Sequence, residues 1–264
     1  MFELYITFMK TWFAQNLQYR FALLIWLIGF VLEPVIYMLV WSTVAQARGG
    51  SVGGYAPGDF ATYFIGSMLL SHLTFDWHFF EIEPRVRNGN FSPLLLRPVH
   101  PIHSDLADNL VYKMMTLPFV LAAAVGVYFA FGAKFDPPAW AALLFIPALL
   151  QAFALRFLLE WTLGLCAFWT TRVQAIVTMY ITCAIFLSGR MAPLSLLPEW
   201  AQRITHALPF RLWISFPVEL MLGRYTFDAA ISDLITQSIW IAVALLILKI
   251  VWSRGMKRYS AVGA

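Results

Sequence analysis

Charge is scarce in this chain of 264 residues, of which only 12% are Asp, Glu, Lys or Arg. A soluble globular domain carries about 25% charged residues. Here 61% of the residues are hydrophobic and 17% are aromatic. A soluble fold of this size always leaves surface in contact with water, so it could not hide so much apolar area. The composition therefore excludes an ordinary soluble domain and indicates an integral membrane protein, which uses the lipid bilayer as its solvent.

Cysteine is almost absent too, and the two that occur, Cys166 and Cys183, lie in apolar surroundings and form no metal or redox motif. The sequence contains no GxxxxGK[ST] loop for ATP, no HExxH zinc motif and no GxSxG nucleophile motif. Any ATP that drives this protein must therefore be bound by another chain. The net charge of +4 comes mainly from basic residues beside apolar runs, which set membrane topology and do not indicate nucleic-acid binding.

Long apolar runs predict an all-α fold with about six transmembrane helices in one permease domain, residues 1–264. A helix needs about 20 mostly apolar residues to cross a bilayer. The expected spans are approximately residues 21–44, 60–80, 110–131, 140–169, 175–188 and 234–252. The fourth run is longer than a bilayer requires, which predicts that it tilts or projects beyond the lipid.

Residues 1–20 lack the features of a cleavable signal peptide and predict an amphipathic helix at the membrane interface. Its apolar residues recur at steps of three and four, although Leu4 and Phe8 blur the pattern. The apolar stripe consists of Phe2, Tyr5, Ile6, Met9, Trp12, Phe13 and Leu17.

The distribution of Lys and Arg favours cytoplasmic N- and C-termini, because basic residues concentrate in short loops on the inner side. With the termini inside, the inner set is Lys10, Arg20, Arg85, Arg87, Arg97, Arg172, Arg254, Lys257 and Arg258. The outer set is Arg48, Lys134, Arg190, Arg203, Arg211 and Arg224. Prolines interrupt the apolar residues 189–226 repeatedly. Irregular backbone cannot face lipid, so this segment predicts a re-entrant element of two short helices that dip into the outer leaflet.

Polar residues inside apolar runs are the first candidates for chemistry. His72, Asp76 and His78 lie close together in sequence, so a metal site is conceivable, although a polar group near the interface is the simpler interpretation. Arg156 and Glu160 are four residues apart and can pair along one helix face.

Ionisable residues within a span usually face the bundle interior or a cavity. The Arg156–Glu160 pair is therefore either a structural ion pair or part of a transport path. Glu33 precedes the kink-forming Pro34, and it leaves the same two interpretations open.

The predicted inner loop, residues 81–109, mixes charges, prolines and apolar residues. A plain connection would be shorter and simply polar. Exposed apolar residues rimmed by charge indicate a docking surface for another protein. The alternative is an amphipathic element that lies on the membrane.

Four stretches, in this order, resemble one family: RNGNFSPLLLRPVHP in the inner loop, SGRMAPLSLLPEW and LPFRLWISFPVELMLGR after the fifth span, and the tail GMKRYSAVGA. Over essentially its whole length the chain resembles the type-2 membrane subunit, or permease, of bacterial ATP-binding-cassette (ABC) exporters, and it looks closest to the multidrug or daunorubicin-like branch.

The resemblance implies a permease of the bacterial inner (plasma) membrane that carries no cofactor itself. It implies that ABC ATPase subunits bind ATP and Mg, and that a second permease pairs with this one as a homodimer or a related heterodimer. Residues 81–109 would contain the coupling helix that seats in the ATPase. The residues implied there are Glu83, Arg85, Arg87, Asn88, Gly89, Phe91, Leu95, Arg97 and Pro98. An amphipathic small molecule, lipid or glycan is the expected cargo.

Two rival functions follow from the residues alone. A six-span membrane enzyme would need convergent catalytic groups, and only the group of His72, Asp76 and His78 comes near. An ion-coupled transporter could use Glu33, Arg156 and Glu160, but such proteins often carry broken helices in both halves. In this sequence a proline-broken segment occurs only in the second half.

Overall fold

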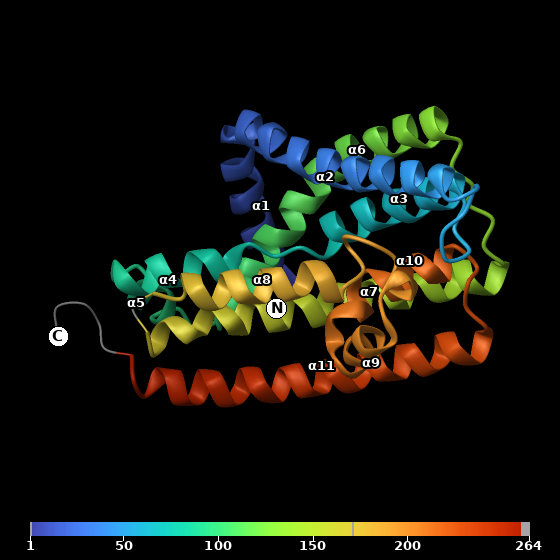
Figure 1. The fold of residues 1–264 in the computed structure, drawn as a ribbon. Coiled ribbons are helices and arrows are strands. Elements are labelled where there is room, and N and C mark those ends of the chain that lie inside the picture. The colour runs from blue at the N-terminus through green and yellow to red at the C-terminus, as the bar shows by residue number, and fades with distance from the viewer. Residues whose placement is uncertain (1, 171, 260–264) are drawn as a thin grey trace.

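The computed structural model describes residues 2–170 and 172–259, and long helices dominate this part of the chain. Figure 1 shows the long helices running side by side along one axis. Helices α4 (His78–Arg87) and α5 (Ser92–Leu95) and the end of α11 (Phe227–Met256) lie at one end of the bundle, and the loops that precede α3 (Pro57–Thr74) and α11 lie at the other. We call these the inner end and the outer end.

The helices are, in order, α1 (Phe2–Gln18), α2 (Arg20–Ala47), α3 (Pro57–Thr74), α4 (His78–Arg87), α5 (Ser92–Leu95), α6 (Ile102–Phe131), α7 (Ala139–Gly164), α8 (Gln174–Leu187), α9 (Glu199–Ala207), α10 (Ser215–Met221) and α11 (Phe227–Met256). Three short 3-10 helices join them: η1 (Leu165–Phe168), η2 (Leu194–Leu196) and η3 (Pro209–Trp213). The predicted tail motif extends to residues 260–264, which lie outside the described residues.

Within the described ranges, four helical segments are long and apolar enough to cross a membrane: Phe21–Ala47, Ile102–Phe131, Ala139–Phe168 and Phe227–Met256. The second predicted span differs from expectation, whereas α8 keeps the predicted bounds of the fifth span, residues 175–188, to within one residue but is short. Helix α3 has 18 residues and ends at Thr74 instead of near residue 80, and α8 has 14 residues. The span count from length and composition is therefore four, and a count of six stays a prediction.

Helix α3 lies inside the bundle, and it is less apolar than the four long helices. Thirteen of its 18 residues are buried, among them Ser67, Ser71 and His72. It packs against α2, α6, α7 and α10. A helix that is shielded by other helices does not need an apolar outer surface, so the composition of α3 agrees with its buried position. The helix ends because Phe75 adopts extended backbone, and the chain resumes as α4 after Trp77.

Helix α1 is more than an interfacial amphipathic helix. Its exposed apolar residues, Phe2, Ile6, Phe13 and Leu17, belong to the predicted stripe. The helix also packs on α6, and Leu4 and Phe8, which blur the stripe, are half-buried. One apolar face therefore stays available to lipid while a second face packs on the protein.

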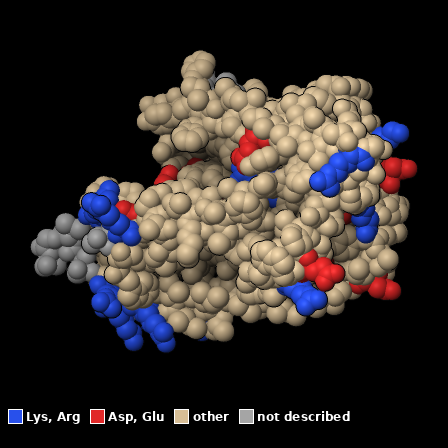
Figure 2. All heavy atoms as spheres, viewed as in Figure 1, with Lys and Arg blue, Asp and Glu red and all other residues tan. Residues whose placement is uncertain are grey.

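The segment of residues 189–226 divides into a buried half and an exposed half. In η3 and α10, large side chains such as Leu212, Trp213 and Phe216 are at most 1% exposed and join the core. Helix α9 lies outside, with 67% of Trp200 exposed. Charged side chains gather mainly at the two ends of the bundle on the face drawn in Figure 2.

Candidate coupling and transport site

The predicted coupling element consists of α4, the following turn and α5 (Figure 1). Helix α4 is amphipathic and buries His78, Phe79 and Ile82 against the bundle. It ends at Asn88, and Gly89 reverses the chain with φ +75°, a conformation that side chains other than glycine rarely adopt. The element packs against α7, η1 and α8.

Some of the predicted coupling residues point into the subunit. A carboxylate oxygen of Glu83 accepts a hydrogen bond from the backbone N–H of Val173 at 2.9 Å. Arg85 donates to both carboxylate oxygens of Asp105, at 2.8 and 3.0 Å. The ring of Phe91 is fully buried and packs on Phe168, Trp252 and Tyr259. These three residues hold the element in place and are not available to another protein.

The other predicted coupling residues face outward. The side chain of Arg87 is 56% exposed, and Asn88, Arg97 and Pro98 are exposed as well. Gly89 and Leu95 are half-buried. Leu96, an apolar residue of the same predicted inner loop, is 88% exposed. We call Arg87, Asn88, Leu96, Arg97 and Pro98 the docking tip.

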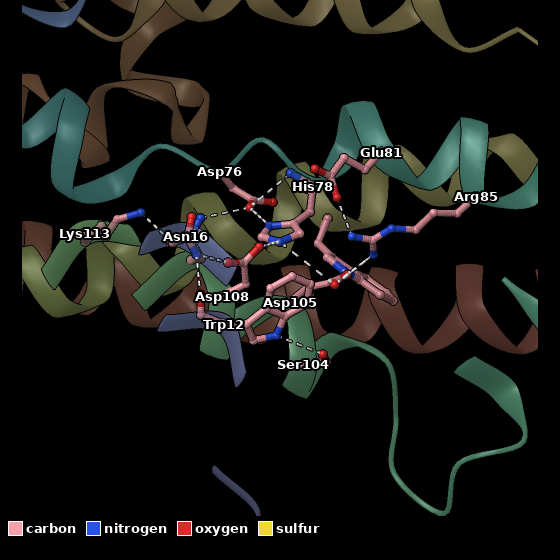
Figure 3. A network of polar contacts seen from close by, with 12 residues as sticks. Trp12, Asn16, Asp76, His78, Glu81, Arg85, Ser104, Asp105, Asp108 and Lys113 are labelled. Atoms are coloured by element: carbon pink, nitrogen blue, oxygen red, sulfur yellow. Dashed lines mark hydrogen bonds and ion pairs between the residues drawn. The ribbon is translucent and has the colours of Figure 1, made fainter. Parts of the chain in front are cut away.

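A buried cluster of charged and polar side chains lies where α3 breaks and α4 begins (Figure 3). We call Asp76, His78, Arg85, Asp105, Asp108, Asn109 and Lys113 the polar junction. His78 Nδ1 lies 2.5 Å from a carboxylate oxygen of Asp76, and its Nε2 lies 3.3 Å from Asp108. Asn109 donates to Asp76 at 3.0 Å. Lys113 donates to the backbone carbonyl of Phe75 at 2.8 Å and so satisfies an acceptor freed by the helix break.

The electrostatics of the junction favour the charged forms of His78 and Arg85. Burial lowers the pKa of His78, but the carboxylates of Asp76, Asp105 and Asp108 more than offset it and raise that pKa to about 10. Both ring nitrogens face carboxylates, an arrangement that suits the doubly protonated ring. Burial also lowers the pKa of Arg85, while Asp105 and Glu81 raise it to a net value above its usual range.

Helix α1 joins this region through three side chains spaced along one of its faces. Tyr5 shares a 2.7 Å hydrogen bond with His103, and Trp12 donates to Ser104 at 3.2 Å. Asn16 donates to Asp108 at 2.9 Å.

Arg156 and Glu160, two of the predicted path residues, form a buried ion pair on α7 at 2.8 Å. Arg156 also donates to Thr74, and Glu160 accepts from the backbone N–H of Asp76 at 3.1 Å. The pair therefore binds the last residue of α3, Thr74, and the backbone of Asp76 in the break between α3 and α4. The hydroxyl of Tyr180 on α8 donates to Glu160 at 3.3 Å.

Glu33, the third predicted path residue, pairs with Arg190 at 2.6 Å, and the two side chains are 33% and 20% exposed. This contact joins α2 to the turn that follows α8. Glu33 and the α7 pair thus belong to separate groups.

His72 does not join Asp76 and His78. Its Nε2 lies 3.1 Å from the hydroxyl of Thr116, and its ring packs edge-on to Phe30. Among the described residues, no group of three or more His, Cys, Asp or Glu side chains could hold a metal ion. The conceivable metal site therefore finds no support in the geometry.

Sequence reasoning missed Asp105, Asp108 and Lys113. The sequence does contain a signal for them, because three ionisable residues lie at the start of an apolar run, where each needs a polar partner. The partners of the two carboxylates on other helices, such as Asn16 of α1 and His78 and Arg85 of α4, lie 20 or more residues away and could not be read from spacing.

The family model for ABC-2 family transporter proteins matches residues 31–263, which include the coupling element, the polar junction and all three predicted path residues. No curated protein matches the chain. The family is a permease component, which fits a subunit that acts with ABC ATPase subunits and has no enzyme activity of its own. The apolar helices agree with a multi-pass membrane protein. The chain belongs to the ABC-2 family of transporter proteins.

Proposed function

We propose that this chain is the permease subunit of an ATP-driven exporter in a bacterial plasma membrane. Helices α3 and α8 cross the membrane together with the four longer helices, which gives six spans and cytoplasmic termini. The excess of Arg and Lys at the inner end supports this orientation. Residues 189–226 form the outer re-entrant segment, and the buried η3 and α10 beside the exposed α9 support that placement.

The docking tip carries the proposal. It combines an apolar side chain, Leu96, with the basic Arg87 and Arg97, and all three are exposed. Exposed apolar surface rimmed by charge is typical of a protein contact. Immediately behind the tip, Glu83, Arg85 and Phe91 fix the element to the bundle. A firmly held element with an exposed tip suits the transmission of motion from an ATPase subunit that binds ATP and Mg.

The transport path is proposed to lie between this subunit and a second permease, which forms a homodimer or a related heterodimer with it. Helix α8 is peripheral, since Val177 is its one buried residue. Its exposed residues include the polar Gln174, Thr178 and Thr182. Exposed polar residues on a membrane helix favour a protein or water contact over lipid. The Glu33–Arg190 pair lies at one end of α8, and Arg156 and Glu160 lie behind it.

The mechanism follows from differential binding. ATP favours the closed ATPase dimer, and a ligand shifts an equilibrium only by its difference in affinity for the two states. Closure moves the two coupling elements, and the permeases rearrange at their shared interface to release cargo outward. The multidrug-like branch predicts an amphipathic small molecule, with a lipid or glycan as the alternative cargo.

The test is co-purification after reversing the charge of the docking tip. The variant Arg87→Glu/Arg97→Glu should bind its ATPase subunit at least about 30-fold more weakly, because like charges facing each other across an interface cost several kcal/mol. Thermal unfolding of the variant should match the wild type, since Arg87 is exposed and pairs with Glu83 near the surface. Arg85 is unsuitable for this test because its charge is paired inside the subunit.

The matched control is Arg48→Glu/Arg203→Glu, which reverses two exposed charges at the outer end. It should retain the ATPase fully. Normal ATPase binding by the docking-tip variant would overturn the assignment of the tip. If wild-type protein from its native operon brought down no nucleotide-binding subunit, the exporter function itself would fail.

A further inference from the structure

Helix α1 is attached to the subunit through polar side chains as well as apolar packing. Its three inward hydrogen bonds reach consecutive parts of the first two turns of α6, at His103, Ser104 and Asp108. A helix that only rests on a membrane has no need of such partners, because its polar face is solvated. Their presence indicates that the position of α1 relative to α6 is specified.

Asp108 differs from the other two partners because it serves two helices at once. One carboxylate oxygen accepts from Asn16 of α1 at 2.9 Å, and the other lies 3.3 Å from His78 Nε2 of α4. The side chain of Asp108 is 9% exposed and that of His78 is fully buried. Hydrogen bonds to an ionised group are roughly twice as strong as neutral ones. One carboxylate of α6 therefore holds both the interface helix and the coupling helix (Figure 3).

We propose that Asp108 is a positioning residue that joins α1 to α4, so that the interface helix and the coupling element move as one piece with the start of α6. The contacts of Asp108 with Asn16 and His78 are sufficient to join the two helices. Its part in energy coupling rests on the proposed function. Helix α1 then serves as an arm of the coupling element in addition to its contact with lipid.

The charge arrangement allows a sharp substitution test. Asn16→Asp places two carboxylates against each other where an amide now donates to Asp108. This should lower the equilibrium constant for docking of α1 by about tenfold, since a hydrogen bond to a charged group contributes about a factor of ten or more. Combining Asn16→Asp with Asp108→Asn reverses the roles. The amide introduced at position 108 can donate to the new carboxylate and still accept from His78, so docking should return.

Spin labels report the docking directly. We would place them at two exposed positions, Lys10→Cys on α1 and Asn90→Cys after α4, in a background with Cys166→Ser and Cys183→Ser. The wild-type background should give one narrow distance distribution. Asn16→Asp should add a broad population, and the double variant should restore the narrow distribution. The matched control is Gln15→Ala, an exposed neighbour on α1, which should stay narrow.

These measurements need only the permease in lipid nanodiscs, so they do not depend on the proposed function. A narrow distribution in Asn16→Asp, or failure of the double variant to restore it, would overturn the role of Asp108. Adding the ATPase subunit and ATP then tests the movement. The distance from α1 to α4 should hold while the distance from Lys10→Cys to a label at Asp228→Cys, at the outer end, changes. A change in the α1–α4 distance would overturn joint movement. An unchanged outer distance would count against the exporter function and leave the joint intact.

Discussion

The inner and outer ends of this bundle are held together by different means. At the inner end, α1, α4 and α6 meet through the polar junction, where buried charges neutralise one another. At the outer end, the segment of residues 189–226 is held chiefly by large apolar side chains such as Trp213 and Phe216. A single bidentate ion pair, Arg211 with Asp233 at 2.6 Å, is buried beside them.

The difference teaches how each end is specified. Apolar packing is strong but tolerant, because side chains of similar volume can replace one another. Buried hydrogen-bonded charges are costly unless every partner is present, so they fix one geometry. The inner end carries the docking tip and, in the proposed mechanism, must deliver a defined movement. The outer end needs to stay closed around its core.

The largest expected effect is at the inner end. Asp105→Ala removes the carboxylate that binds Arg85 and accepts from Trp161 Nε1 at 2.9 Å. The free energy of unfolding should fall by about 3–5 kcal/mol, because Arg85 keeps only its pair with Glu81 and the buried indole N–H of Trp161 loses its acceptor. Unfolding by SDS titration in mixed micelles measures it. The exposed Asp136→Ala is the control and should leave stability within about 0.5 kcal/mol. A similar small loss in Asp105→Ala would mean that the junction does not hold the inner end.

The next effect is at the outer end. Leu212 of η3 is fully buried, so Leu212→Ala should lower the free energy of unfolding by about 3 kcal/mol through lost burial and a cavity. Ile204→Ala on α9 is the control, because 44% of that residue is exposed. Co-purification with the ATPase subunit distinguishes the two ends of the bundle further. Leu212→Ala should keep its ATPase subunit, whereas Asp105→Ala should lose it. Equal loss of the ATPase in both variants would erase the distinction between the ends.

The sequence predicted the helical membrane class and the pairing of Arg156 with Glu160. These features are local or compositional, so they can be read without a fold. Family membership bears out the membrane permease, while the role of the coupling residues stays a prediction. Helix α3 was expected to continue to residue 80, yet it stops at Thr74. Lys113 and Asn109 bind the freed backbone carbonyl of Phe75 there, and such a tertiary compensation leaves no mark on hydropathy.

The division of the coupling residues could not be predicted either. Arg85 and Arg87 are two residues apart and look equivalent in the sequence, but a helix turns about 200° between them. One therefore faces Asp105 while the other faces outward. Only the position of α6 decides which of the two is buried. The same limit applies to Asn16, whose role depends on where α1 lies against α6.

The last expected effect is a dependence on pH that belongs to the inner end. The pKa of His78, ordinarily 6.5, is about 10 in the folded protein, where the ring faces Asp76, Asp105 and Asp108. A group whose pKa is raised on folding contributes its full stability below its unfolded pKa, and it loses that contribution as pH rises toward the folded value. The contribution of His78 to the midpoint temperature of unfolding should therefore fall between pH 6.5 and about 10, and the difference between the wild type and His78→Gln measures it. In His78→Gln, which cannot take up the proton, this part of the slope should disappear.

Ser104→Ala separates the slope from a general loss of stability. It removes a neutral hydrogen bond from Trp12 at the same end, so it should lower the midpoint by a similar amount at every pH. Asp76→Asn removes the nearest charge partner of His78 and should flatten the slope as well. A midpoint difference between the wild type and His78→Gln that stays constant from pH 6.5 to 10 would mean that His78 is neutral in the folded protein. The inner end would then be held by neutral hydrogen bonds around that ring, and its contrast with the outer end would rest on Arg85 and Asp105 alone.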